Sequence, residues 1–322
     1  MNVPVFDFHC DTILALLGED MNTAGSLKSN SYHIDLDRAG KLPGYAQCFA
    51  CFTTPLMEEW YHISPIVLFE REIATIQREV DANSDRIAIA YSPDEIEQNQ
   101  KNGMMSAILT LEGTAGIDYN PELLEDLHLI GFRTVSLGWN EQNPLTGSHL
   151  TGGGLTDLGR EFVKEAQRLG FLVDVSHISD EGFWDIMTIT EAPVIATHSN
   201  SRAICGNSRN LTDEMFRAIV QTGGVAGYNM CDEFTGEDKP TLDTVCDHLL
   251  HFMELDPTGK HIALGGDLDG VDKFPEGFEG VQSWGALARK MAERGFAEDT
   301  IRDIFWNNGI GVMRRAVCNH KK

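Results

Sequence analysis

The sequence predicts an α/β protein folded as a (β/α)8 TIM-type barrel. Two observations lead to this fold class. Short apolar runs alternate with longer amphipathic segments along the whole chain, and eight of these runs are rich in Val, Ile, Phe and Ala, as strands buried on both faces should be. No Pro-, Gly- or Ser-rich linker interrupts the alternation. We therefore expect residues 1–322 to form a single domain.

The eight predicted strands are short and separated by enough chain for a crossover helix. They are residues 3–8, 45–52, 106–111, 132–137, 171–176, 193–198, 224–229 and 261–266. A further apolar run, IAIAY at 87–91, is either an extra strand or a replacement for one of the eight. A doubly wound open sheet is the alternative architecture, but no glycine-rich phosphate-binding turn follows the first strand.

Amphipathic patterns between the strands predict the helices. One pattern covers 65–80, and another covers 157–170, with Asp157 as the cap and Gly170 as the stop. The segment 212–223 repeats the pattern with Thr212 at its start and Gly223 at its end.

The segment TLDTVCDHLLHFM, residues 241–253, is read as one more helix. Its His248 and His251 have the spacing of a ligand pair. We interpret them as part of a half-exposed helix face, because no strand end supports a ligand role.

The composition excludes several classes of function. The chain has 25 Lys and Arg against 49 Asp and Glu, a formal charge of −24, which repels nucleic acids and anionic lipid surfaces. No apolar stretch reaches the roughly 18 residues of a membrane span, and the N-terminus lacks a leader pattern, so we expect a cytoplasmic protein. The seven cysteines are scattered, and we interpret the CxxC pair Cys48 and Cys51 as buried strand residues.

Histidines and carboxylates follow five of the eight predicted strands. The carboxyl ends of barrel strands build the active site, so these side chains are expected to meet there. Residues two apart on a strand face the same way, so His9 and Asp11 can bind one ion together. The set consists of His9, Asp11, Glu112, His177, His198 and Asp267.

This donor set predicts a catalytic metal site. Imidazole and carboxylate together suit zinc, and suit manganese or iron less well. Three imidazoles and two carboxylates exceed the needs of one tetrahedral ion but suit two ions that share Glu112 and hold a hydroxide between them. Asp267 is then left as the group that moves protons. Asp269 lies close by in the sequence, but Asp267 is nearer the strand end.

Six ordered motifs resemble the renal (membrane) dipeptidase family of the metal-dependent amidohydrolase superfamily. They are HCDT at 9–12, LEG at 111–113, VDVSHIS at 173–179, THS at 197–199, SRN at 208–210 and GGDLDG at 265–270. The resemblance implies a (β/α)8 barrel with two zinc ions per chain. It also implies hydrolysis of dipeptides by a metal-bridging hydroxide, often with a D-residue on the C-terminal side. The expected partner is thus a small dipeptide substrate, and a homodimer is compatible with the family.

The resemblance also implies a role for each site residue. His9, Asp11 and Glu112 resemble the ligands of one zinc, and Glu112, His177 and His198 those of the other. Asp267 resembles the acid/base that passes a proton to the leaving amine. Arg209 resembles the residue that pairs with the terminal carboxylate of the dipeptide, a role that suits a planar, permanently charged guanidinium.

One departure from the family pattern concerns the segment VSLGWN at 135–140. Family members usually carry a substrate-contacting His in a pattern like LTHxxN, and Leu137 occupies that position if Asn140 aligns with the family's Asn. An apolar side chain cannot donate to a developing oxyanion. His149, in the glycine-rich loop GSHLTGGG, is a candidate to reach into the site from the side, but we interpret it as an inert loop residue.

The leading hypothesis is therefore a zinc-dependent dipeptidase. The Leu137 departure keeps open another amidohydrolase activity on the same metals, such as an N-acyl-amino-acid deacylase or a lactonase. A metal-binding protein without turnover is the third hypothesis, and the presence of Asp267 beside a complete ligand set argues against it.

Overall fold

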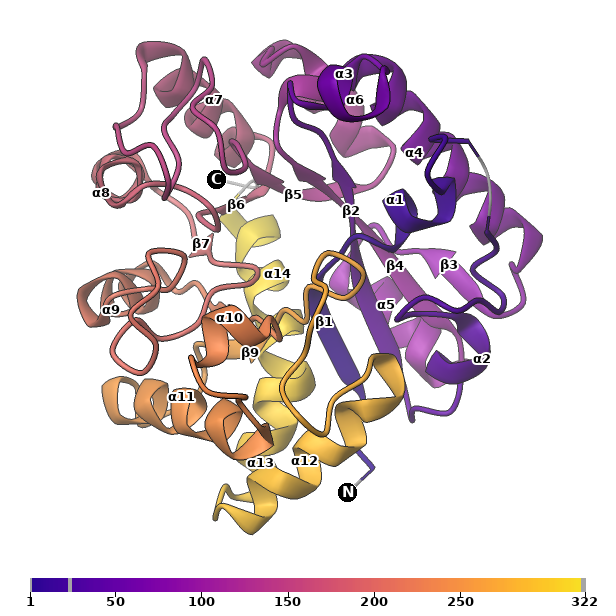
Figure 1. Cartoon of the computed structure of the whole chain (residues 1–322), viewed down its shortest axis with the longest axis vertical. Coiled ribbons are helices and arrows are strands. Elements are labelled where there is room, and N and C mark those ends of the chain that lie inside the picture. The colour runs from indigo at the N-terminus through magenta and orange to yellow at the C-terminus, as the bar shows by residue number, and fades with distance from the viewer. Residues whose placement is uncertain (1, 23–24, 320–322) are drawn as a thin grey trace.

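The structure is a computed structural model that describes residues 2–22 and 25–319 (Figure 1). Strands and helices alternate through this part of the chain. Its strands are β1 (Val5–Cys10), β2 (Tyr45–Phe52), β3 (Ile87–Ile89), β4 (Met105–Glu112), β5 (Phe132–Ser136), β6 (Leu172–Asp174), β7 (Val194–Ile195), β8 (Ala226–Tyr228) and β9 (Ile262–Leu264).

The strands form a nearly closed parallel barrel. Their order is β7-β6-β5-β4-β2-β1-β9-β8, with every neighbouring pair parallel. An isolated parallel bridge between Ala196 and Ala226 joins the two ends of this order. The predicted barrel class is therefore confirmed, and each of the eight predicted strands corresponds to one barrel strand. The extent of the domain, 1–322, stays a prediction.

The run at 87–91 is the extra strand. Ile87–Ile89 forms β3, which pairs in parallel with the first residues of β4 and lies off the barrel path. Further along β4, from Leu109 onward, β5 takes over the pairing. β3 thus displaces none of the predicted strands.

The helices surround the strands (Figure 1). Short helices and single turns lie in the loops, and the longer helices form the outer layer. The helices are α1 (Thr12–Leu17), α2 (Leu36–Ala39), α3 (Met57–Tyr61), α4 (Pro65–Ala82), α5 (Pro93–Lys101), α6 (Leu124–Leu129), α7 (Asp157–Arg168), α8 (Asp180–Ile189), α9 (Asp213–Thr222), α10 (Asp232–Thr235), α11 (Leu242–Leu255), α12 (Trp284–Glu293), α13 (Glu298–Arg302) and α14 (Asn308–Asn319). Four further turns are η1 (Ala115–Ile117), η2 (Pro121–Leu123), η3 (Val281–Ser283) and the π-helical η4 (Asp303–Asn307).

Two details of the helices differ from the sequence prediction. The cap of α7 is Thr156, whose hydroxyl accepts from the Gly159 amide at 3.0 Å, so Asp157 is the first helical residue. Threonine, with its side-chain oxygen, satisfies an otherwise unpaired amide at this position. The second correction concerns His248, which is buried rather than half-exposed; its Nδ1 accepts from the Ser201 amide at 3.2 Å.

Several smaller predictions are confirmed. Thr212 caps α9 by accepting from the Met215 amide, and Gly223 ends the helix in the left-handed conformation. Cys48 and Cys51 lie buried in β2 as free thiols. Among the helices of residues 2–22 and 25–319, none combines the length and the apolar character that a membrane crossing needs.

Apolar side chains fill the amino end of the barrel. Phe6 and Phe8 of β1 are almost completely buried in a cluster that also takes side chains from β2, β4, β6, β7 and β9. Trp306 and Ile310, from η4 and α14, belong to the same cluster, and α14 is seen through the middle of the barrel in Figure 1. Each buried Phe contributes on the order of 2 kcal/mol. This packing leaves the carboxyl end of the barrel for polar side chains.

Candidate metal centre

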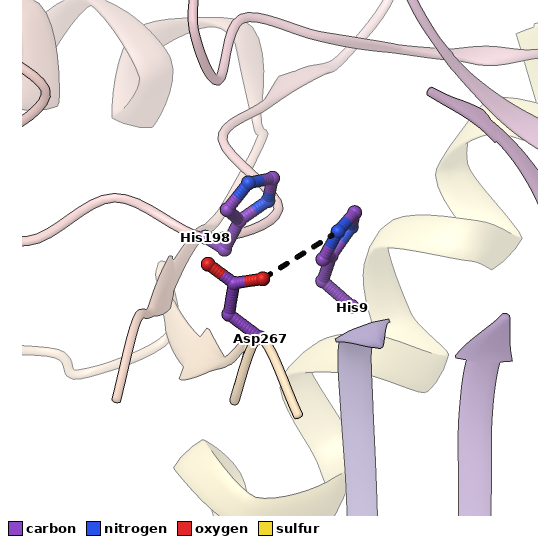
Figure 2. A group of neighbouring side chains, drawn as sticks. All are labelled: His9, His198 and Asp267. Carbon is purple, nitrogen blue, oxygen red and sulfur yellow. Dashed lines mark ion pairs between the residues drawn. The ribbon is translucent and has the colours of Figure 1, made fainter. Parts of the chain in front are cut away.

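Six polar side chains converge at the carboxyl end of the barrel, and we call them the charged floor. They lie on a strand or within three residues of its end, and each is 1–8% exposed. Figure 2 shows three of them turned toward one another. The charged floor consists of His9, Asp11, Glu112, His177, His198 and Asp267.

Glu112 lies at the centre of the charged floor. Its Oε2 is 3.2 Å from His9 Nε2, and its Oε1 is 3.2 Å from His177 Nε2 and 3.9 Å from His198 Nε2. The two oxygens of one carboxylate therefore face two different sets of imidazoles.

Three overlapping groups of ligand atoms result. In each group the atoms lie within 4.8 Å of one another, close enough to hold one ion. The groups are His9 with Asp11 and Glu112; Glu112 with His177 and His198; and His9 with His198 and Asp267. The sequence-predicted ligands are thus brought together, and Asp267 lies beside them.

Hydrogen bonds fix the protons of two imidazoles. His177 Nδ1 is 2.8 Å from Asn140 Oδ1, an oxygen that can only accept, so Nδ1 carries the proton. His198 Nδ1 is 2.6 Å from Thr197 Oγ1, and that hydroxyl already donates to Asp174 Oδ2 at 2.6 Å. His198 Nδ1 must therefore donate as well.

Both Nε2 atoms are consequently left with bare lone pairs. They face each other at 3.0 Å, where neither has a proton to donate to the other. Burial lowers the pKa of His177 to about 3 and that of His198 well below its ordinary value, which keeps both rings neutral. Two converging lone pairs beside a carboxylate fit a metal cation, and a metal-binding His commonly donates its other nitrogen to a polar partner in this way.

The other side of the charged floor concentrates negative charge. Burial disfavours the charged form of His9, but Glu112 and Asp11 outweigh burial and raise its pKa well above the ordinary value. Burial and the neighbouring Glu112 raise the pKa of Asp11 to about 7. His9 Nε2 is buried without a hydrogen-bond partner. A cation at this position would reduce the repulsion between Asp11 and Glu112 and would bind His9 Nε2, so these residues also fit a metal.

The backbone around the charged floor is unusually constrained. His177 and Asp267 adopt left-handed conformations with φ of 70° and 55°, which side chains other than Gly seldom adopt. Gly113 has φ of 73°, and a Cβ there would lie 2.1 Å from the Thr53 carbonyl oxygen. At Gly270 a Cβ would lie 2.2 Å from Asp11 Oδ2, so only Gly allows this loop to approach the acids.

Asp267 and its neighbour Asp269 have different surroundings. Asp267 Oδ1 is 3.9 Å from His9 Nε2, and its Oδ2 accepts from Asn229 Nδ2 at 2.9 Å. Asp269 instead accepts from the Thr12 hydroxyl and the His33 amide, both at 2.6 Å. Asp269 therefore fixes the loop, whereas Asp267 faces the ligand atoms.

A cleft of about 410 Å³ opens above the charged floor. One side of it is apolar, with Leu14 of α1, Phe52 of β2 and Trp139 in the loop after β5. Trp139 lies edge-on to Phe52 at 5.3 Å between ring centroids and is backed by Trp60 of α3 at 5.7 Å. We call the three aromatic side chains, Phe52, Trp60 and Trp139, the aromatic wall.

Arg209 lies beside the charged floor in a small hollow that it shares with His149, His177 and Ser199. The side chain is buried, and Nη1 donates to Ser199 Oγ at 2.7 Å. Its Nε and Nη2 have no hydrogen-bond partner, although the guanidinium stacks 5.8 Å from the Phe234 ring. A buried cation with free donors is suited to an anionic group of a ligand.

Leu137, which takes the position of the family's substrate-contacting His if Asn140 aligns, is not among the residues that line the cleft. Its side chain is fully buried in the main apolar core, one residue beyond the end of β5 at Ser136. Trp139 and Asn140 line the cleft in its place. His149, which we interpreted as an inert loop residue, has a hydrogen-bond partner beside the cleft, since its Nε2 is 2.9 Å from Asn140 Oδ1. No local pattern in the sequence signals either contact.

Comparison with known proteins places the chain in a family. The profile described as membrane dipeptidase, peptidase family M19, matches residues 1–322. An uncharacterized dipeptidase of Schizosaccharomyces pombe is 32% identical over 241 residues, which cover 72% of this chain and 57% of the yeast protein. An uncharacterized Klebsiella pneumoniae protein is 29% identical over 266 residues, covering 78% and 96% of the two chains.

Solved structures agree with this placement. A Rhodobacter sphaeroides metallopeptidase, crystallised with a phosphinate mimic of the dipeptide L-Ala-D-Ala, superposes with a TM-score of 0.87 at 26% identity, covering 98% of this chain and 100% of that one. A probable dipeptidase of Pseudomonas aeruginosa shares the fold with a TM-score of 0.87 at 17% identity, covering 98% of this chain and 96% of its own. The chain therefore belongs to the membrane dipeptidase family, peptidase family M19, and is a hydrolase of the metallopeptidase class.

Proposed function

We propose that this protein hydrolyses the peptide bond of dipeptides with two zinc ions held in the charged floor. The observation that carries the proposal is the division of Glu112 between two ligand groups, with its two oxygens facing His9 on one side and His177 on the other. A bridging carboxylate of this kind is what a pair of closely spaced ions requires.

The ligands divide into two sets in this proposal. His9, Asp11 and Glu112 hold one ion, and Glu112, His177 and His198 hold the other. With no thiolate in either set, the site is of the catalytic type rather than the closed structural type. Bound zinc supplies a water that is acidic enough to act as the nucleophile near neutral pH.

Asp267 is the proton carrier in this scheme. It accepts a proton as water adds to the carbonyl carbon, and it returns that proton to the amine as the C–N bond breaks. Burial raises its pKa, although His9 opposes the shift, and a raised pKa favours a carboxylate that must both take and give a proton. The hydrogen bond from Asn229 holds the other oxygen in place.

Arg209 binds the terminal carboxylate of the dipeptide. Its free Nε and Nη2 offer two donors, the arrangement that a carboxylate accepts in a bidentate manner. Because the Rhodobacter relative was crystallised with a mimic of L-Ala-D-Ala, we extend the proposal to dipeptides with a D-residue at the C-terminal side.

The test combines elemental analysis with a substrate panel. Purified protein is assayed for zinc per chain and for turnover of L,L-dipeptides, L,D-dipeptides, N-acyl amino acids and lactones. We expect two zinc ions per chain and turnover confined mainly to dipeptides. Turnover of N-acyl amino acids or lactones alone would overturn the proposal in favour of another amidohydrolase, and metal binding without any turnover would overturn it altogether.

A further inference from the structure

A chain of hydrogen bonds leads from His177 to the surface, and we call its three members the loop relay: Asn140, His149 and Ser208. His177 Nδ1 and His149 Nε2 both approach Asn140 Oδ1, at 2.8 and 2.9 Å. His149 Nδ1 is 3.0 Å from Ser208 Oγ.

With both imidazoles neutral, only one arrangement of protons satisfies the whole relay. Asn140 Oδ1 can only accept, so His177 Nδ1 and His149 Nε2 each donate to it. A neutral imidazole then has its other nitrogen free to accept, and the Ser208 hydroxyl donates to His149 Nδ1. The relay therefore holds His177 in the tautomer whose Nε2 lone pair faces Glu112 and His198.

We propose that the loop relay positions His177 as a metal ligand and sets the affinity of the ion that it shares with Glu112 and His198. This inference rests on the proposed function. It assigns a positioning role to Asn140 and, through Asn140, to His149. It leaves the ion held by His9 and Asp11 outside the influence of the relay.

The hydrogen bonds that hold His198, the neighbouring metal ligand, show by comparison why His177 needs such a relay. His198 is supported inside the barrel, where Thr197 Oγ1 contacts its Nδ1 and donates to Asp174, the last residue of β6. Asp174 also accepts the Thr197 amide at 2.8 Å, so that support is buried and braced by the sheet. His177, like His198, lies three residues beyond its strand, but it has φ of 70° and its Nδ1 contacts a loop residue, Asn140.

The support of His177 comes from loops instead. The glycine-rich loop is fastened to it by the His149 amide, which donates to the His177 carbonyl at 2.9 Å, and by a bridge between Ser148 and Ile178. These backbone contacts deliver the His149 side chain to Asn140. Ser208 comes from a separate loop, next to Arg209 in the chain, and completes the relay.

Zinc binding to the metal-free protein tests the relay directly. In a titration against a competing chelator, Asn140→Leu should weaken one of two zinc-binding steps by about 10–100-fold, the usual cost of losing the partner of a ligating imidazole. The other step should keep its wild-type affinity. Asn140→Asp, which retains an oxygen acceptor for both imidazoles, should restore most of the lost affinity, and His149→Phe should cause a smaller loss than Asn140→Leu.

A spectroscopic measurement separates positioning from a general effect on the fold. In protein loaded with Co²⁺, Asn140→Leu should alter the visible absorption of one cobalt site only. Gln142→Leu is the matched control, because this exposed neighbour takes no part in the relay, and it should behave as wild type. Thermal unfolding of the metal-free proteins checks that the variants are folded, and Asn140→Ser replaces the leucine variant if that one is not.

Unchanged zinc affinity in Asn140→Leu would overturn the inference, and so would an equal loss at both steps or a failure of Asn140→Asp to recover. These outcomes differ from a failure of the proposed function. Wild-type protein that binds two zinc ions but cleaves no dipeptide contradicts the proposed function and leaves the relay measurement intact.

Discussion

The charged floor and the aromatic wall border the same cleft but are built in different ways. The floor residues are fixed by strand ends, are buried, and are held by hydrogen bonds such as that from Asn229 to Asp267. The wall side chains come mainly from helices and loops, and Trp60 is 43% exposed. Rigid placement suits groups that must hold ions within a few tenths of an ångström. A loop-borne apolar surface suits the selection of a substrate side chain, so the two regions are expected to control rate and specificity separately.

The strongest test of the floor is the substitution Glu112→Ala. This carboxylate faces both ligand sets, so its loss should remove at least one of the two zinc ions. Turnover should fall by more than about 10⁴-fold, the upper value for losing a side-chain base, because the nucleophile is lost as well. Zinc analysis and steady-state kinetics measure both effects. Glu233→Ala, at the exposed rim of the same cleft, is the control and should keep both zinc ions.

Asp267→Asn should affect the rate without emptying the site. The variant can still accept from Asn229, so the local hydrogen bond survives, but it cannot carry a proton. We expect kcat to fall by about 10²–10⁴-fold while zinc remains at the wild-type level. Loss of zinc in this variant would show that Asp267 belongs to the ligands rather than to the proton path.

The floor and the wall also differ in how far the sequence predicts them. His9, Glu112, His198 and Asp267 were accessible because apolar strand patterns are local, and a parallel barrel brings the ends of all its strands together. The wall was missed because Trp60 and Trp139 lie about 80 positions apart and meet only through tertiary packing.

The errors of the sequence prediction have a similar origin. The apolar pattern of β5 indicates the strand but not which residues beyond it face the cleft, so the sequence did not show that Leu137 is buried in the core. His248 was taken as half-exposed because helical spacing does not reveal that the loop containing Ser201 covers it. Likewise, nothing local connects His149 with Asn140 and His177.

Arg209→Gln tests the binding of the substrate carboxylate. The guanidinium has two free nitrogens but does not contact the ligand atoms of the floor through a hydrogen bond. Losing a charge-assisted interaction of about 1.5–3 kcal/mol should raise KM for dipeptides by roughly 10–100-fold, with a smaller change in kcat. A dipeptide amide, which lacks the carboxylate, should be a poor substrate for wild type and variant alike. Equal losses for both substrates would contradict the assignment.

The stability of the metal-free protein should depend on pH through Asp7, a buried carboxyl next to the charged floor. Asp7 is fully buried beneath it, with Oδ1 accepting from the Gly266 amide at 2.7 Å and Oδ2 unpaired. Burial raises its pKa from 3.8 to about 7. A raised pKa in the folded state means that the stabilising contribution is complete below pH 3.8 and is lost as the pH rises through about 7.

Asp7→Asn should therefore flatten this dependence. Between pH 4 and pH 7 the melting temperature of the metal-free wild type should fall more steeply than that of the variant, and thermal unfolding at several pH values measures the difference. Parallel curves would show that Asp7 remains ionised beneath the floor.

Trp139→Ala should give the smallest effect and the sharpest distinction between floor and wall. If the wall selects side chains, kcat/KM for dipeptides with an aromatic residue should fall about 10-fold, from lost ring packing and lost apolar burial. Dipeptides of Gly and Ala should change much less, and Trp184→Ala, an exposed residue of α8 outside the cleft, should change neither. Trp139 also lies 6.1 Å from the His177 ring. An equal loss for every dipeptide, accompanied by weaker zinc binding, would therefore mean that Trp139 acts as a support of the floor and that the separation of the two regions fails at this residue.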